Sequence, residues 1–316
     1  MNPAYSVIFF TTASGAGYGL MVWLAAVGVS GAAPAGSPIA LWGHAIAIAL
    51  AAAGLLASTA HLGRPSRAWR AFSQWRTSWL SREGIVSLAT FLPALAYAAS
   101  WGLLHAPRGA ASWAAFGAAV GALGTVWCTG MIYQSLPTIR AWNQALVTPI
   151  YLVNALATGG LLAMLLLRSS ALPSDSPAVI VAVLLASGLV LKQRYWHEID
   201  TAPRTHTAEA ATGLGGFGTV RVLDQPHTQA NFVMREMGYQ VGRKHALRLR
   251  RVALLCAFIA PLLLTLTAIA LGPSRIATLA TLIAVVFAAV GVVVERWLFF
   301  AEAQHVVTLY YGAARA

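Results

Sequence analysis

Charged residues are scarce in this sequence. Only 9% of its 316 residues are Asp, Glu, Lys or Arg, against about 25% in soluble globular domains. Hydrophobic residues make up 58% of the chain, the mean hydropathy is +0.69, and the apolar runs are spread along the whole length. This pattern excludes a water-soluble globular domain and predicts a polytopic membrane protein.

Cysteine is scarce as well. The two cysteines, Cys128 and Cys256, lie in different apolar runs. An iron–sulfur cluster typically takes four thiolates and a structural zinc takes four Cys or His ligands, so cysteine can build neither site here. A Cys-x-x-Cys-His motif for covalent haem attachment is also absent. We expect no metal site in this chain, and any cluster must belong to a partner.

Acidic residues are few in comparison with basic ones. There are 9 Asp and Glu against 21 Lys and Arg, a formal net charge of +12. In a soluble chain this excess would suggest nucleic acid, but in a membrane chain basic residues gather in cytoplasmic loops. We therefore expect no nucleic-acid partner.

Eight apolar stretches are long enough to cross about 30 Å of hydrocarbon. No basic residue precedes the first one, unlike in a signal peptide, so we expect it to be retained as a helix. The sequence thus predicts an all-α bundle of eight transmembrane helices, with residues 1–316 forming a single integral membrane domain. The expected spans are residues 5–30, 39–61, 83–104, 112–135, 148–168, 176–195, 252–271 and 276–300.

The basic residues predict how this bundle is oriented. Of the 21, 18 fall in the termini or in the stretches after the second, fourth and sixth spans. The other three, Arg108, Arg168 and Arg275, fall on the opposite side. Because basic loops face the cytoplasm, both termini are expected inside.

Two of these cytoplasmic stretches are too long to be simple turns. Residues 62–82 are rich in Arg and Trp, which suits a segment at the lipid–water interface. Residues 192–251 form the only sizeable extramembrane piece. Their basic and aromatic side chains suit docking to a protein partner or to lipid head groups equally well. The candidate docking residues are Arg67, Arg70, His227, Arg243, Lys244 and His245.

An imidazole and a carboxylate mark a candidate quinone site. His61 closes the second span and Glu83 opens the third, so both lie at the same face of the bilayer. A quinone needs hydrogen-bond donors and a group that exchanges a proton near neutral pH. Arg64 or Arg82 would hold the acidic partner, and Thr12 and Tyr133 are the next candidates. The alternative is that His61 caps a helix while Glu83 neutralises a nearby arginine.

The histidines do not favour haem b. His44 and His61 are 17 residues apart, which is about 25 Å along one helix, so they cannot ligate the same haem. The remaining histidines fall in loops or near span ends. We expect no haem, and we expect His44 to be a packed helix residue that bonds to a neighbour.

Several segments together resemble the membrane anchor subunits of dimethyl sulfoxide reductase-type enzymes, the DmsC-like family. The similarity extends over essentially the full length, and the long sixth loop looks most like the branch associated with cytoplasmic sulfite-oxidising complexes. The segments that carry it are residues 6–12, 58–65, 78–83, 130–133, 138–143 and 226–246.

The resemblance implies an eight-helix anchor in a bacterial inner membrane. Such an anchor holds a molybdopterin catalytic subunit and a four-cluster ferredoxin-like iron–sulfur subunit, and it exchanges electrons with ubiquinone or menaquinone without haem. In the family, the residues matching His61 and Glu83 are implicated in quinol binding. The chain would not act on the catalytic substrate itself but would serve a quinone-dependent oxidoreductase, expected here to be a sulfite dehydrogenase.

Two alternatives remain. The same architecture can run in reverse, oxidising menaquinol to reduce dimethyl sulfoxide or another S- or N-oxide. A secondary transporter also has many Gly-rich spans, but it usually places charged sites near the midplane, often with internal repeats. In this sequence the centres of the spans are expected to be almost free of charge.

Overall fold

The computed structural model describes residues 2–59, 64–203, 206–224, 229, 231–237 and 244–314. Within these ranges the regular elements are all helices, and eight of them are long and apolar enough to cross a membrane, which confirms the predicted all-α bundle. These eight are α1 (Tyr5–Ser30), α2 (Pro38–Thr59), α3 (Trp79–Gly102), α4 (Ala111–Gln134), α5 (Val147–Ser169), α6 (Asp175–Thr201), a seventh that runs from α10 (Ala246–Leu254) through the π-helical turn η3 (Leu255–Ile259) to α11 (Ala260–Ala270), and α12 (Arg275–Ala301).

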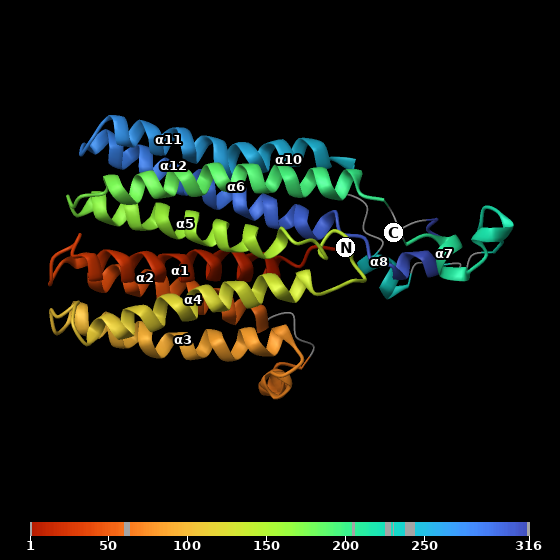
Figure 1. Ribbon diagram of the computed structural model, residues 1–316, viewed down its shortest axis with the longest axis horizontal. Coiled ribbons are helices and arrows are strands. Elements are labelled where there is room, and N and C mark those ends of the chain that lie inside the picture. Colours follow the sequence, from red (N-terminus) through yellow and green to blue (C-terminus); the bar gives the residue numbers. More distant parts are fainter. Residues whose placement is uncertain are drawn as a thin grey trace.

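The eight helices run side by side along the long axis of the molecule (Figure 1). Helix α1 lies in the middle, where it contacts α2, α4, α5 and α12. Both ends of the chain lie at one end of the bundle, as an even number of crossings requires. We call this end, which also carries the extramembrane helices, the loop end.

Glycines allow α1 and α5 to touch along their backbones. A methyl group added at Gly19 would overlap the carbonyl group of Ala155, and one added at Gly159 would overlap the backbone of Gly19. Small residues at such crossings allow close van der Waals packing in lipid. The small residues of these spans therefore allow two helices to pack with their backbones in contact.

Three helices extend further toward the loop end than the hydropathy predicts. Helix α3 begins four residues earlier, at Trp79, α6 continues six residues longer, to Thr201, and α10 begins six residues earlier, at Ala246. Charged side chains stabilise two of these extensions, because Arg250 pairs with Asp200 at 2.6 Å and with Glu302 at 2.8 Å. Helices α6 and α10 are thus separated by residues 202–245.

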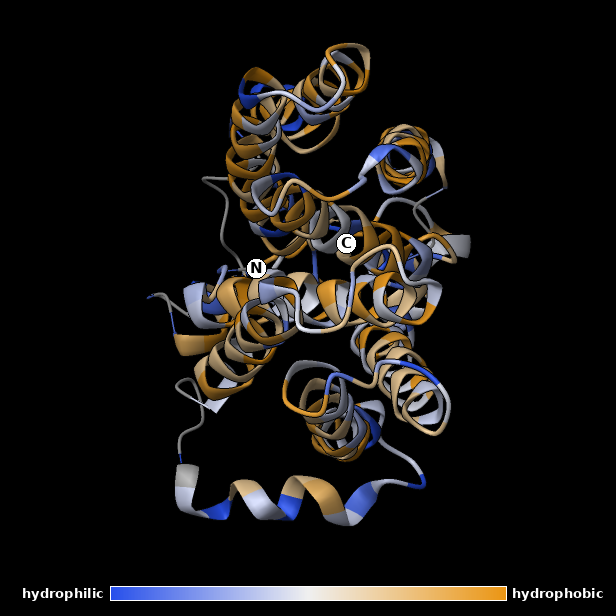
Figure 2. Ribbon diagram, turned by 90° about the vertical axis from the view of Figure 1, so that its left-hand side faces the viewer, coloured by the Kyte–Doolittle hydropathy of each residue, from blue (hydrophilic) through white to orange (hydrophobic). Residues whose placement is uncertain are grey.

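A short amphipathic 3₁₀-helix, η1 (Pro65–Gln74), lies across the bundle axis below α3 (Figure 2). The Ser81 hydroxyl donates to the Ala71 carbonyl, and the Arg82 guanidinium donates to the carbonyls of Trp75 (2.9 Å) and Arg76 (2.6 Å). Trp69 and Trp75 remain exposed. This is the orientation expected of a segment that lies along a membrane surface.

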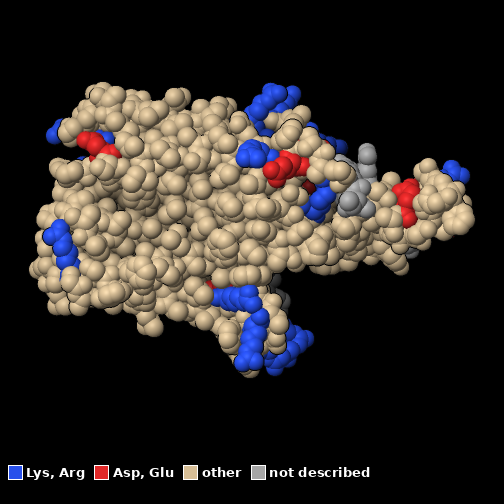
Figure 3. All heavy atoms as spheres, in the orientation of Figure 1, with Lys and Arg blue, Asp and Glu red and all other residues tan. Residues whose placement is uncertain are grey.

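The remaining described segments fold onto the chain ends. They contain α7 (Ala208–Thr212), η2 (Gly215–Phe217), α8 (Phe232–Met237) and α13 (Val307–Tyr310). The Asn2 amide donates to the Glu236 carbonyl at 2.7 Å, and the Ala208 amide donates to the Ala314 carbonyl at 3.0 Å. Basic side chains gather on η1 and around the loop end (Figure 3).

Candidate functional site

A cavity of about 490 Å³ opens near the loop end, between α1, α2, α3, α4 and η1. Its size is that of a pocket for a small organic ligand. Most of the lining is apolar, with a few polar groups at separate points. The lining residues are Val7, Phe10, Leu55, Leu56, Ser58, Thr59, Ala68, Ala71, Phe72, Leu80, Glu83, Gly84, Ser87, Leu88, Ile132 and Tyr133.

The cavity also borders the side of the bundle that faces lipid. Three of its lining side chains, Leu56, Leu80 and Leu88, are 70%, 55% and 54% exposed. Exposed apolar side chains therefore border the cavity on the outer surface of the bundle. On the opposite side, Phe72 of η1 packs against Gly84 of α3, where a β-carbon would meet the ring.

Glu83 is the charged group of this cavity. It lies in the second turn of α3 and is only 4% exposed. The hydroxyl of Thr129 on α4 donates to its carboxylate, while within the described ranges no basic side chain forms an ion pair with it. A buried carboxylate at membrane depth, held by a hydroxyl rather than a cation, is a functional candidate by default.

Tyr133 lies at the end of α4 and lines the same cavity. Its ring stacks on Tyr151 of α5 with centroids 5.9 Å apart, and it makes an edge contact with Trp142 at 5.1 Å. The indole nitrogen of Trp142 donates to the Phe299 carbonyl at 2.9 Å. Aromatic packing therefore fixes the position of Tyr133 at the cavity wall.

The structure brings some of the predicted quinone-site residues together and separates others. Glu83 and Tyr133 share the cavity, whereas Thr12 lines a second, smaller cavity. Arg64 is exposed at the start of η1, and the Arg82 guanidinium is bound to loop carbonyls. His61 lies outside the described residues, but Thr59, two positions before it, lines the cavity.

The candidate docking residues that the structure describes are exposed. Arg67 and Arg70 lie on η1, and Lys244 and His245 lie at the start of α10. All four are near the loop end. His227 and Arg243 lie outside the described residues.

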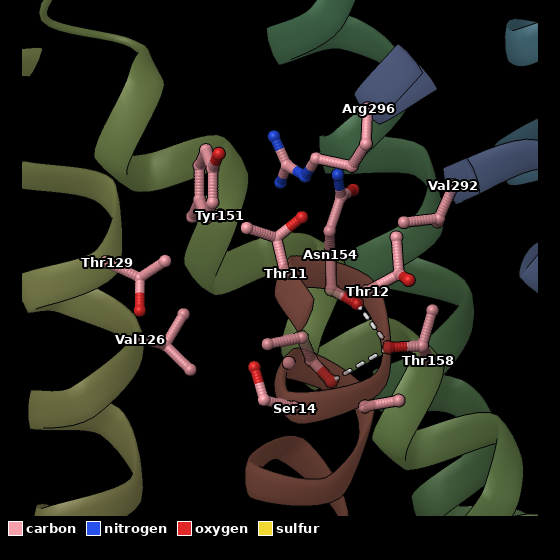
Figure 4. A pocket seen from close by; sticks show the side chains of 13 residues that line it. Thr11, Thr12, Ser14, Val126, Thr129, Tyr151, Asn154, Thr158, Val292 and Arg296 are labelled. Atoms are coloured by element: carbon pink, nitrogen blue, oxygen red, sulfur yellow. Dashed lines mark hydrogen bonds between the residues drawn. The ribbon is translucent and has the colours of Figure 1, made fainter. Parts of the chain in front are cut away.

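The second cavity lies deeper among α1, α4, α5 and α12 (Figure 4). Its free volume is about 10 Å³, and hydroxyls, an amide and a guanidinium line it. Thr129 belongs to this lining too, so one residue borders the small cavity and donates a hydrogen bond to the Glu83 carboxylate. The polar residues around the small cavity are Thr11, Thr12, Ser14, Thr129, Tyr151, Asn154, Thr158 and Arg296.

A buried charged cluster adjoins the small cavity. Lys192 of α6 pairs with Glu295 of α12 at 2.5 Å, and Arg296 lies 3.5 Å from the same carboxylate. All three side chains are at most 3% exposed. The Arg296 guanidinium also lies over the Tyr151 ring, 3.5 Å from its centroid.

This cluster is not predicted by the sequence pattern. Hydropathy counts Lys192 with the extramembrane residues 192–251, and it gives no sign that the glutamate and arginine of α12 are buried. The bundle nevertheless encloses all three side chains. The detectable signal was the continuation of apolar and aromatic residues past each charge, such as Tyr195 and Trp196 after Lys192. All three charged residues lie in the half of their helix that is nearer the loop end.

His44 behaves as predicted. It is 3% exposed, its Nδ1 bonds to the Ala40 carbonyl at 2.6 Å, and its ring packs edge-on against Tyr97 and Trp101. This confirms the expectation of a packed helix residue that bonds to a neighbour.

Comparison of the sequence with known proteins identifies the family to which the chain belongs. Residues 1–312 match the family model described as DMSO reductase anchor subunit (DmsC). The chain is also 35% identical to a sulfite dehydrogenase subunit from Allochromatium vinosum, in an alignment that covers 98% of this chain and 99% of that protein. Both matches span all eight membrane helices, so they include both cavities.

Proposed function

The chain belongs to the DMSO reductase anchor subunit family, and on that premise we propose that it is the quinone-reactive anchor of a membrane-bound sulfite dehydrogenase. In this role it receives electrons from an iron–sulfur partner and reduces a quinone of the membrane pool. The observation that carries the proposal is the cavity between α1, α2, α3, α4 and η1, which has apolar walls with exposed leucines at its border and a buried carboxylate inside.

The residues present fit a quinone. The volume of about 490 Å³ accommodates a head group and the first part of an apolar tail. Leu56, Leu80 and Leu88 would contact the tail, while Glu83 and Tyr133 offer polar atoms to the head group. When bound, the quinone supplies the two-electron, two-proton chemistry, and the protein supplies position and protons.

Each polar residue has a proposed role. His61, two positions beyond the cavity residue Thr59, donates a hydrogen bond and a proton at one carbonyl oxygen. Glu83 donates a proton on the other side, and Thr129 fixes the orientation of its carboxyl group. Tyr133 forms part of the cavity wall. The sequence analysis did not single out Thr129, so its role is an addition to the predicted site.

The partners are also part of the proposal. We assign the electron donor to a four-cluster ferredoxin-like subunit and the sulfite chemistry to a molybdopterin subunit, with no haem between the donor and the quinone. The exposed Arg67, Arg70, Lys244 and His245 lie at the loop end, where the donor must approach the cavity. Because this end carries most of the basic residues, we place it in the cytoplasm of a bacterial inner membrane.

Purification of the intact complex tests this function. Solubilised with its partners, the complex should reduce a short-chain ubiquinone or menaquinone analogue when sulfite is supplied, and a known inhibitor of quinone sites should block this but not sulfite oxidation by a soluble acceptor. Reduction of dimethyl sulfoxide by menaquinol without sulfite oxidation would establish the reverse direction instead. If neither reaction couples to quinone, the proposed function is wrong.

A further inference from the structure

Buried polar atoms without partners surround the small cavity. Asn154 is 4% exposed, and both atoms of its amide lack a hydrogen-bond partner in the part of the chain that the structure describes. The same holds for the Tyr151 hydroxyl and the Arg296 Nε. Buried polar groups are nearly always satisfied, by protein or by ordered water.

The cavity beside these atoms has room for about one water molecule. Its free volume of about 10 Å³ is at the lower limit for a single water. Such a site also needs two to four polar partners, which the Asn154 amide and neighbouring hydroxyls provide (Figure 4). An apolar cavity of this size would be empty, but this one is lined by polar groups that can bind a water molecule.

On one side the small cavity touches the charged cluster. Arg296 lines it, and Arg296 and Lys192 share the carboxylate of Glu295. Nearer the loop end, Lys192 and Arg250 lie over the Trp196 ring at 4.8 Å and 5.2 Å from its centroid. Ionisable groups thus continue from the cluster toward solvent.

Glu302 lies on the solvent side of the cluster, just beyond the end of α12. Burial raises the pKa of its carboxyl group, while the neighbouring Arg250 and the charge of Lys192 lower it. Arg250 also pairs with Asp200, whose side chain is 54% exposed. The Glu302 carboxyl group is therefore paired with Arg250, which also reaches the exposed Asp200, and it feels the charge of the buried Lys192.

On the other side the small cavity touches the quinone cavity. Thr129 lines the small cavity, and its hydroxyl donates to Glu83, which lines the large one. The same hydroxyl is within 3.0 Å of the Thr125 carbonyl, so it has a second acceptor. For Thr129 to relay a proton, its oxygen would accept one from a water molecule in the small cavity while the hydroxyl gives its own to the carboxylate.

We propose that a water molecule in the small cavity joins the Lys192–Glu295–Arg296 cluster to Glu83 through Asn154 and Thr129, and that this chain returns a proton to Glu83 after each turnover. The inference rests on the proposed function. Reduction of one quinone takes two electrons from the one-electron donor of the partner and two protons, forming two O–H bonds. Glu83 gives one proton and His61 gives the other. The carboxylate left on Glu83 is then protonated along the chain, from water at the loop end, and the imidazole of His61 takes up its proton from the same aqueous side, so both donors are restored.

The main test replaces Asn154 with leucine, which has nearly the same volume but no polar atoms. The matched control is Thr281→Val, because Thr281 is fully buried in α12 and its hydroxyl bonds only to its own helix. Both variants are studied in the intact complex. Infrared spectroscopy measures how fast the Glu83 carboxyl exchanges its proton for deuterium, with the band assigned by Glu83→Gln.

The expected result is that Asn154→Leu slows this exchange by at least about tenfold and lowers quinone-coupled turnover by a similar factor. The solvent isotope effect on turnover should also rise, since reprotonation becomes limiting. Thr281→Val should match the wild type in all three measurements. Exchange in Asn154→Leu at the wild-type rate overturns the proposal.

Two further variants probe the ends of the chain. Thr129→Val should slow the exchange and Thr129→Ser should restore it, because only the serine keeps a hydroxyl. Lys192→Met combined with Glu295→Gln removes the ion pair while keeping the net charge of the cluster, and replacing a buried pair as a whole is often tolerated. Unchanged exchange in this double variant excludes the cluster as the proton source.

The exchange measurement needs no bound quinone, which separates the two proposals. If the complex does not couple to quinone at all, the proposed function fails but the exchange rates still report on the proton chain. If coupling is normal and Asn154→Leu has no effect on either rate, only the proton chain is wrong.

Discussion

Glu83→Gln should lower quinone-coupled sulfite oxidation of the assembled complex by about 100- to 10,000-fold, the usual effect of removing a positioned proton-transfer group. Glutamine has the same shape and can still accept the Thr129 hydrogen bond, so the cavity should keep its form. What is lost is the exchangeable proton. Steady-state turnover with a quinone analogue measures the effect.

His61→Ala should have an effect of the same order, because it removes the proton donor assigned to the other carbonyl oxygen. A soluble artificial acceptor takes electrons before they reach this subunit, so activity with it should survive in both variants. The matched control is Glu209→Gln, a substitution of the same kind at a partly exposed residue of α7 that lines neither cavity. Quinone-coupled turnover within about threefold of wild type in both site variants would place the quinone elsewhere.

The second prediction with a large effect concerns orientation. A reporter that is active only in the periplasm should be silent when fused after Ala316, and active when inserted near Ala35 or Ser170. In the structure the last two positions lie at the end of the bundle opposite the loop end, in the turns after α1 and α5. The response should be all or none, because each site is on one side of the membrane.

This prediction follows from charge as well as from topology. Eighteen of 21 basic residues fall on the side of the termini, and moving them across the membrane is unfavourable. Cytoplasm-specific and periplasm-specific reporters used in parallel give opposite signals and control for expression. The reverse pattern would place the partner subunits outside the cytoplasm and favour the dimethyl sulfoxide reductase alternative.

Hydropathy was sufficient to predict the eight helices and one part of the site. Glu83 and Tyr133 mark the ends of apolar runs at the same face, so their proximity follows from the number and direction of the crossings. The cavity itself was not predictable, because it depends on how η1 lies against α3 through Ser81 and Arg82. A hydropathy plot contains no information about such contacts.

The buried cluster was missed for a different reason. A window average treats Lys192 as the end of a span, whereas lateral packing of α6 against α12 decides whether a charge finds a partner at that depth. Thr12 illustrates the converse limit. It is polar and near the end of a span, but the rotation of α1 directs it to the small cavity rather than to the quinone cavity.

Photoaffinity labelling tests the central claim most directly. A quinone analogue with a photoreactive group on its ring is bound to the intact complex in membranes, and the labelled peptides of this subunit are identified by mass spectrometry. We predict labels on η1 and on the loop-end turns of α2, α3 and α4, around Phe72, Glu83 and Tyr133, and their loss when excess ubiquinone competes. Competable labelling confined to helices that do not line this cavity, such as α6 or α11, would contradict the account.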